Sequence, residues 1–354
     1  MELLPILHEL IEKSGKRVVS EKLNLSCGTI DRWVELRNVP QMYEFDLLKL
    51  ANKKIDYSRY SSKQKDQFFT PVATAKKCYE LFSDEIKKYG DKVDDFDYIE
   101  PSAGDGSFLK VLPSNTIALD VDPKQEYIVE QDYLVWTPYV DIAEQNNLTA
   151  KRSGNRLVVF GNPPFGTRGH TALKFINHSN KFAEYVCFIL PQLFESDGKG
   201  APRKRVEGFN LIFSTKLESL FYEPNKNELK INTIFQIWSK NHTNTEYDIK
   251  KYETDKMKIY SLSDGGTVAS TRNKRMIDNC DVYLPSTCFG ITNVKYYLNF
   301  KELPCERGFG IVFSEDCKNE MMEKVMRIKW CEIAFLSTNS AYNLRSSQIY
   351  SVLL

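Results

Sequence analysis

The sequence predicts a doubly wound α/β sheet in residues 66–240, between a helical N-terminal domain (1–60) and a smaller α+β domain (241–354). Short apolar runs with strand character alternate there with stretches of helical periodicity, a pattern typical of a mostly parallel sheet with helices on both faces. In such sheets, ligands bind outside the carboxyl ends of the strands. Strands are expected at 98–100, 116–120, 157–160, 185–190 and 231–238, and helices at 71–89 and 170–182.

The N-terminal domain is expected to be mainly helical, because apolar residues recur at helical spacing from Leu3 to Ile11. Two further short helices, at 17–23 and 29–34, flank a small polar turn, as in a helix-turn-helix. Residues 28–33 resemble the recognition helix of phage-repressor-like domains, which implies contacts to nucleic acid from Thr29, Asp31 and Arg32. A plain helical bundle that acts as a cap or dimer element is the alternative.

The C-terminal domain contains mixed short elements. Its turn signals are Asp264-Gly-Gly266 and Gly308-Phe-Gly310. Before the central domain, the polar and charged residues 51–66 are expected to form the end of the helical unit and a linker.

Composition excludes several classes of protein. The 354 residues carry 48 basic and 47 acidic side chains, so DNA contacts must come from local patches rather than net charge. No apolar run reaches the length of about 18 residues that suggests a membrane span, and a signal-peptide pattern is absent. Eight cysteines without C-x-x-C spacing argue against a zinc site or a disulfide framework. We therefore expect a cytoplasmic protein with no membrane partner and no metal.

The residues Asn162-Pro163-Pro164-Phe165 follow the strand at 157–160 after one glycine. Each proline holds φ at about −65° and lacks an N–H, and Pro164 also keeps Pro163 out of the helical region. Backbone carbonyls here therefore point outward, and Asn162 adds a side-chain acceptor. Two acceptors beside an aromatic ring suit the exocyclic amine of a nucleobase. A simple strand-ending turn is the alternative, since Asn-Pro is a common turn signal.

A glycine loop, Glu100-Pro-Ser-Ala-Gly-Asp-Gly106, follows the first strand. Gly104 and Gly106 allow a close approach of the backbone to a ligand. Leu109 occupies the position where a dinucleotide site has its third glycine. The loop therefore favours a cofactor without a pyrophosphate group.

Acidic residues after the glycine loop favour a cofactor that contains adenosine. Asp120 ends the second strand, where ribose hydroxyls need a two-oxygen acceptor, and is preferred to Asp122. Asp132, beside apolar Leu134, is suited to accept from an adenine amine. Each acid could instead be an ordinary strand-end or turn residue, but their order between the glycines and Asn162 favours one site. A phosphate-free cofactor with adenosine is S-adenosylmethionine (SAM).

These motifs resemble those of the adenine-N6 amino-methyltransferases of DNA, of restriction–modification and phage type. In that family the cofactor motifs precede the catalytic motif and a target-recognition domain follows. The resemblance covers roughly residues 66–240 and implies a Rossmann-like, SAM-dependent methyltransferase sheet. Residues 241–354 would then be the target-recognition domain.

The resemblance also implies a role for each matching residue. Asn162, Pro163, Pro164 and Phe165 match the catalytic motif, in which asparagine favours adenine and serine is typical of cytosine-N4 enzymes. Thr70 is expected to cap a helix whose first residue is Pro71. Phe235 matches an aromatic residue that packs on the flipped base. The implied cofactor-binding residues are Phe69, Thr70, Pro71, Glu100, Pro101, Gly104, Gly106, Asp120, Asp132, Tyr133 and Asn162.

Two basic clusters are candidate phosphate contacts. One loop contains Lys199, Arg203, Lys204 and Arg205, and the C-terminal domain contains the cluster 272–275. Solvated surface loops are the alternative in both cases.

The expected activity is SAM-dependent methylation of adenine N6 in double-stranded DNA after base flipping. A cognate restriction endonuclease is a second partner that the resemblance allows. RNA adenine methylation keeps the same chemistry and is the first alternative. The second is a DNA-binding regulator that acts through residues 1–60 and has an inactive methyltransferase fold.

Overall fold

The structure is a computed structural model, and it describes residues 3–23, 25–53, 55–56, 59–60, 65–138, 156–198, 201–217, 220–223, 227–249, 252–265, 271–337 and 341–354. The chain divides into two compact units, Met1–Phe188 with Ser219–Lys230, and Ile189–Glu218 with Ile231–Leu354. The division near residue 188 falls inside the strand Tyr185–Pro191.

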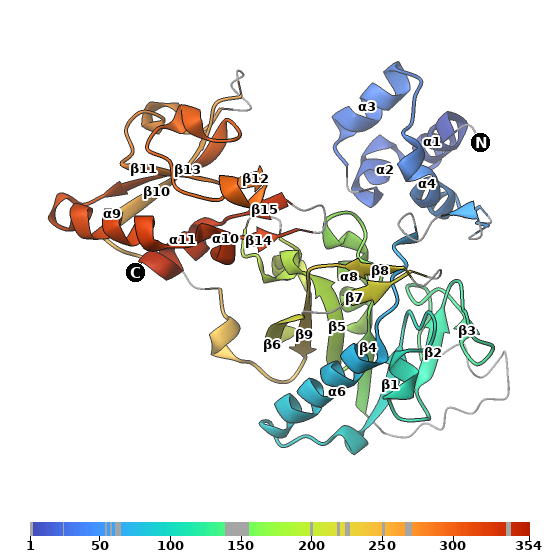
Figure 1. Cartoon of the computed structure of the whole chain (residues 1–354). Coiled ribbons are helices and arrows are strands. Elements are labelled where there is room, and N and C mark those ends of the chain that lie inside the picture. The colour runs from blue at the N-terminus through green and yellow to red at the C-terminus, as the bar shows by residue number, and fades with distance from the viewer. Residues whose placement is uncertain are drawn as a thin grey trace. The chain divides into compact units, whose positions relative to one another are not determined.

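A seven-stranded sheet forms the centre of the fold (Figure 1). Its order is β3 (Val129–Glu130), β2 (Ile117–Asp120), β1 (Phe96–Glu100), β4 (Arg156–Gly161), β5 (Tyr185–Pro191), β9 (Thr233–Ser239) and β6 (Asn210–Leu217). The pairs from β3 to β5 are parallel, whereas β6 and β9 are antiparallel.

The order of the strands confirms a mixed α/β fold with a large, mostly parallel sheet. It matches the doubly wound order 3-2-1-4-5-6, with β9 inserted between the fifth and sixth positions. This arrangement is consistent with a methyltransferase fold. The carboxyl ends of β1, β2 and β4 meet at one edge of the sheet, because these strands are parallel neighbours.

Helices α6 (Val72–Lys87) and α8 (His170–Ser179) are shorter than expected, and each buries one apolar face. On α6 that face includes Cys78, Phe82 and Ile86, which recur at the four-residue spacing of one helix face. The ring of Phe82 meets Phe160 of β4 edge-on at 5.7 Å between centroids. Strands β5 and β9 are buried along their whole length, as is typical of strands covered on both faces.

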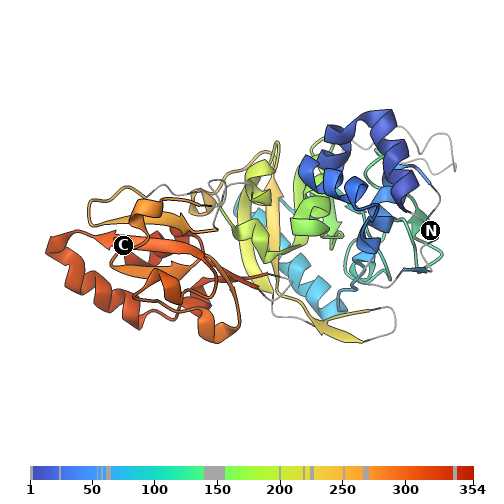
Figure 2. The same ribbon diagram turned by 90° about the horizontal axis from the view of Figure 1, so that it is seen from above.

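The N-terminal helices are α1 (Leu3–Ser14), α2 (Lys16–Lys22), α3 (Cys27–Glu35) and α4 (Glu44–Leu50). The four helices, drawn in blue, pack together (Figure 2). Their shared core includes Leu7, Ile30, Trp33 and Leu47. Ser26 caps α3 by accepting a hydrogen bond from the Thr29 N–H at 3.1 Å. Helix α2 ends at Lys22, and α3 begins five residues later at Cys27.

The C-terminal part of the second unit contains two small antiparallel sheets and three helices among its described residues. The first sheet has the order β10 (Met257–Ser263), β13 (Arg307–Phe313), β11 (Val282–Pro285). The second has the order β12 (Thr287–Phe289), β15 (Ala341–Asn343), β14 (Phe335–Leu336). The helices are α9 (Lys318–Arg327), α10 (Trp330–Ile333) and α11 (Ser346–Leu353). No helix in the described ranges is long and apolar enough to cross a bilayer.

The expected turn at Gly308-Phe-Gly310 is wrong, because both glycines lie within β13. A Cβ on Gly308 would lie 2.4 Å from the Leu284 carbonyl oxygen, and one on Gly310 would lie 2.5 Å from Cys280 Sγ. Glycine is needed here for close packing rather than for a turn.

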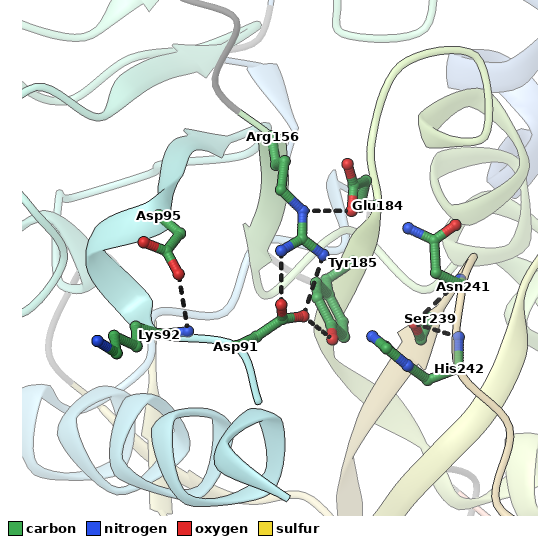
Figure 3. A network of polar contacts seen from close by, with 9 residues as sticks. All are labelled: Asp91, Lys92, Asp95, Arg156, Glu184, Tyr185, Ser239, Asn241 and His242. Atoms are coloured by element: carbon green, nitrogen blue, oxygen red, sulfur yellow. Dashed lines mark hydrogen bonds and ion pairs between the residues drawn. The ribbon is translucent and has the colours of Figure 1, made fainter. Parts of the chain in front are cut away.

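A network of polar contacts joins the amino ends of β4 and β5 to the segment before β1 (Figure 3). The Arg156 guanidinium donates to Asp91 Oδ1 at 2.5 Å and Oδ2 at 3.0 Å, and to Glu184 Oε2 at 2.6 Å. Tyr185 donates its hydroxyl to the same Asp91 carboxylate at 2.6 Å. The network lies at the edge of the sheet opposite the carboxyl ends of the strands, so its role is structural.

We expect the Asp91→Ala substitution to destabilise the protein by about 2 kcal/mol, because it removes the acceptor of Arg156 and Tyr185. Only 12% of the Asp91 side chain is exposed, so water replaces these bonds poorly. Urea unfolding of the full chain measures the effect as a lower midpoint. Asp94→Ala, an exposed acid in the same segment, serves as the matched control. Equal midpoints for the two variants would contradict the prediction.

Candidate active site

The candidate site lies within the first unit, at the carboxyl ends of the parallel strands. Glu100 ends β1, Asp120 ends β2, and Asn162 follows β4 directly. The Ser102 hydroxyl of the glycine loop donates to the Asn162 backbone oxygen at 3.2 Å. The structure thus brings the glycine loop and the Asn-Pro-Pro-Phe turn together.

The side chain of Asn162 is oriented by two hydrogen bonds. Its Nδ2 donates to the Phe68 carbonyl oxygen at 3.1 Å and to Thr70 Oγ1 at 3.2 Å. Since the carbonyl can only accept, the amide nitrogen must face it, and Oδ1 faces the other way. Asn162 Oδ1 is buried and has no hydrogen-bond partner among the described residues. A buried acceptor left unpaired costs about 1–3 kcal/mol, which favours a ligand N–H at this position.

The remainder of the turn is held from two sides. The Phe165 carbonyl accepts from the N–H groups of Thr171 and Ala172, at 3.1 and 3.3 Å, in the first turn of α8. The Gly166 N–H donates to Asp66 Oδ2 at 2.6 Å. Pro163 is buried, whereas Pro164 and Phe165 are half-buried. The backbone is therefore fixed while the Phe165 ring keeps partial access to solvent.

Asp66 is a residue of this site that the sequence analysis missed. Its carboxylate accepts from the backbone N–H groups of Gly166 and Phe165, and these bonds partly oppose the rise in its pKa that burial causes. Its φ is 54°, a conformation that aspartate tolerates better than most residues. No local pattern marks Asp66, because its partners lie 100 residues further along the chain.

Thr70 has a different role from the one expected. Helix α6 begins at Val72 with Pro71 at its N-cap and no side-chain cap bond, so Thr70 does not cap it. Its buried hydroxyl accepts from Asn162 instead. A threonine before Pro favours a cap locally, but the tertiary contact to the turn after β4 takes precedence.

The glycine loop adopts the left-handed backbone that glycine permits, with φ of 54° at Gly104 and 80° at Gly106. The Gly104 N–H donates to Asp120 Oδ2 at 2.8 Å, and the Asp122 N–H donates to Asp120 Oδ1 at 2.8 Å. Asp120 therefore ties the loop to β2, and each of its oxygens has a lone pair left for a further donor. Asp122 instead pairs with Lys65 and Lys124, at 3.2 and 2.6 Å.

A second missed residue, Tyr222, lies over the glycine loop. It belongs to the hairpin of β7 (Leu220–Tyr222) and β8 (Glu228–Lys230) and forms an antiparallel bridge with Phe69. Its hydroxyl donates to Asp105 Oδ2 at 2.8 Å. The Phe69 ring lies so close to Gly104 that a Cβ there would be 3.0 Å from it. Phe69 and Tyr222 thus cover the loop together.

Glu100 is the most deeply buried acid of the site, with 1% of its surface exposed. Burial, followed by the negative charges of Asp120 and Asp105, raises the pKa of its carboxyl well above the ordinary value. Neighbouring Pro101 is also buried. Glu100 Cγ lies 3.5 Å from the position that a Cβ on Gly161 would take, so the side chain lies against the residue before Asn162.

Two of the expected ligand contacts are buried, and a third pairs with a lysine. Tyr133 is 1% exposed, and its ring packs against Phe175 while its hydroxyl lies 2.7 Å from Ser179 Oγ. Phe235 is completely buried in β9, so its ring is a core group rather than a surface for a base. Asp132 accepts from the Leu134 N–H at 3.0 Å and pairs with Lys49 of α4 at 3.2 Å.

The basic loop of the second unit is only partly exposed. Lys199 lies outside the described residues. Lys204 is exposed, whereas Arg203 and Arg205 are half-buried, and burial lowers the pKa of Arg203. The charged residues of the 272–275 cluster are all exposed.

The expected recognition residues lie on α3 of the N-terminal bundle. Arg32 is exposed, Thr29 is half-buried, and Asp31 pairs with Lys16 at 2.7 Å. A surface hollow of ≈ 440 Å³ follows this part of the helix. It is lined by Ser26, Gly28, Thr29, Arg32, Trp33, Leu36, Asn38 and Pro40.

Comparison with known proteins gives only distant likenesses. Neither a family model nor a curated protein sequence matches the chain. A candidate RNA methyltransferase from Pyrococcus horikoshii matches with a TM-score of 0.35 and 17% identity, over 57% of this chain and 98% of the other. A structure of a type I restriction–modification system matches with a TM-score of 0.32 and 16% identity, over 66% and 59%.

The modification subunit of a candidate type I restriction enzyme from Vibrio vulnificus has a TM-score of 0.33 and 13% identity, over 71% of this chain and 60% of the other. This chain thus spans about three fifths of the length of both restriction–modification structures. Likenesses this distant carry no argument about substrate, which must come from the site itself.

Proposed function

We propose that this protein transfers a methyl group from SAM to the N6 amine of adenine in DNA after the base has left the duplex. The observation that carries the proposal is the orientation of Asn162. Its Oδ1 is buried and unpaired within the described part of the chain, and its backbone oxygen accepts from Ser102 of the glycine loop. An acceptor held in this way suits an incoming N–H donor.

The residues around the glycine loop fit the cofactor. Gly104 and Gly106 give the loop the left-handed backbone that glycine permits, and Glu100 and Asp120 supply acceptors for cationic and hydroxyl groups. The loop lacks the third glycine of a pyrophosphate site, and SAM has no phosphate. When bound, SAM supplies a methyl group on a positively charged sulfur.

The chemical role of the turn follows from the electronic structure of adenine. Its exocyclic amine is a poor nucleophile, because the nitrogen lone pair is delocalised into the ring. Acceptance of both N–H bonds by Asn162 Oδ1 and the Pro163 carbonyl would shift the nitrogen toward tetrahedral geometry and stabilise the positive charge that develops on it. Phe165 would stack on the base. The proton then leaves an alkylated and therefore acidic nitrogen, so no base is required before the attack.

Duplex DNA is the substrate that the N-terminal domain favours. Helices α2 and α3 follow each other as in a helix-turn-helix, and α3 presents Arg32 to solvent. RNA remains the alternative, since the turn after β4 would bind adenine in either nucleic acid.

Transfer of a labelled methyl group to duplex DNA, RNA and protein tests the proposal. We expect label in duplex DNA, at N6 of adenine, and none with the Asn162→Ala variant. Label in RNA alone would instead assign the RNA activity. Duplex binding through residues 1–60 without any transfer would identify a regulator.

A further inference from the structure

Glu100 differs from the other acids of the site in having a buried oxygen without a donor. Its Oε2 is buried and has no hydrogen-bond partner among the residues that the structure describes. Asp120 accepts from the N–H groups of Gly104 and Asp122, and Asp105 accepts from Ser107 and Tyr222. The two neighbouring carboxylates are therefore satisfied, and Glu100 is not.

The charges that act on Glu100 are of one sign. Asp105 on the glycine loop and Asp120 on β2 both oppose its ionisation, and burial acts in the same direction. From β4, the side chain meets the uncharged Gly161. An isolated carboxylate in such surroundings is costly, so a buried acid keeps its proton until a cation arrives.

We propose that Glu100 is a neutral carboxylic acid while the cofactor site is empty, and that a cationic group of SAM displaces its proton on binding. This inference rests on the proposed function. The proton passes to solvent, the carboxylate pairs with the incoming cation, and no other bond changes. SAM carries two such groups, the α-ammonium and the sulfonium, and either one would supply the charge.

The displacement makes cofactor affinity depend on pH. In the free protein the pKa of Glu100 is raised, and in the complex the cation lowers this pKa again. Binding therefore releases a proton when the pH lies between the pKa of the complex and the pKa of the free protein. Below the free-protein pKa, affinity therefore falls as pH falls, by at most about tenfold per pH unit for one proton.

Isothermal titration calorimetry of the full chain at a series of pH values measures the release directly. Titrations in two buffers of different ionisation enthalpy give the number of protons released per ligand. We expect a release of up to about one proton for SAM with the native protein, largest at a pH between the two pKa values, and a release close to zero with Glu100→Gln at every pH. Glu130→Gln, at an exposed position on β3, is the matched control and should release as many protons as the native protein.

S-adenosylhomocysteine (SAH), which keeps the ammonium but lacks the sulfonium, identifies the cation. Release with both ligands assigns the ammonium as the partner of Glu100, and release with SAM alone assigns the sulfonium. Binding of SAM without proton release by the native protein would overturn the inference and leave the proposed function intact. Failure of both ligands to bind would instead remove the proposed function.

Discussion

Asn162→Ala is expected to lower the rate of methyl transfer by about 10²–10³-fold, with little change in affinity for SAM. The substitution removes the acceptor Oδ1 that would act on the amine as charge develops, and a single oriented group of this kind contributes about 10²–10³ in kcat. It also removes the donor to Phe68 and Thr70, so the turn loses part of its support. Single-turnover kinetics and calorimetry on the same preparation separate the two effects.

Asn115→Ala is a suitable control for this experiment. Asn115 is exposed, and its amide contacts only Asp97 in the hydrogen bonds described for it. This variant should keep both the rate and the affinity. If Asn162→Ala instead folds normally but no longer binds the cofactor, Asn162 has a structural role in the cofactor site and not the catalytic role proposed for it.

The second large effect is expected for Gly166→Ala, which should lower kcat by about 10²-fold. Gly166 has φ 67°, and a Cβ there would lie 2.1 Å from Thr171 Oγ1 and 2.9 Å from the Thr171 backbone nitrogen. The backbone must therefore move at the point that Asp66 and α8 hold, and Phe165 moves with it. A displacement of roughly 1 Å in a reacting site costs about 10²-fold in rate.

Gly90→Ala separates this steric effect from ordinary backbone strain. Gly90 has φ 84°, and no atom lies within 4 Å of the Cβ that alanine would add. The Gly90→Ala variant is therefore destabilised only by the left-handed backbone of a residue with a Cβ, by about 1–2 kcal/mol. Gly166→Ala should lose more stability than Gly90→Ala, and only Gly166→Ala should lose activity. Equal kcat values for the two variants would show that the turn after β4 tolerates displacement.

Much of the central fold could be predicted because its signals are local. Apolar runs separated by helical stretches indicate parallel strands, and the carboxyl ends of such strands meet. That reasoning alone places Glu100, Asp120 and Asn162 at one edge of the sheet, as observed.

Burial was harder to predict than strand position. Phe235 belongs to a strand that is covered on both faces, so no alternation of polar and apolar residues marks which side chains reach a ligand. Tyr133 follows an acid at a predicted motif, yet its ring packs into the core near α8. A motif match reports sequence order, whereas exposure depends on what the rest of the chain covers.

By itself, the sequence determined five of the seven strands of the large sheet, the glycine loop and the turn Asn162–Phe165 that follows β4. Only the tertiary structure decided which polar atoms are paired, because those partners lie far away in sequence. Asp66 reaches Gly166 across 100 residues, and Tyr222 reaches Asp105 across 117. Hydrogen bonds over such separations leave no periodic pattern in the sequence, yet they orient Asn162 and its turn. In the described structure, one oxygen of Asn162 and one of Glu100 are buried without a donor.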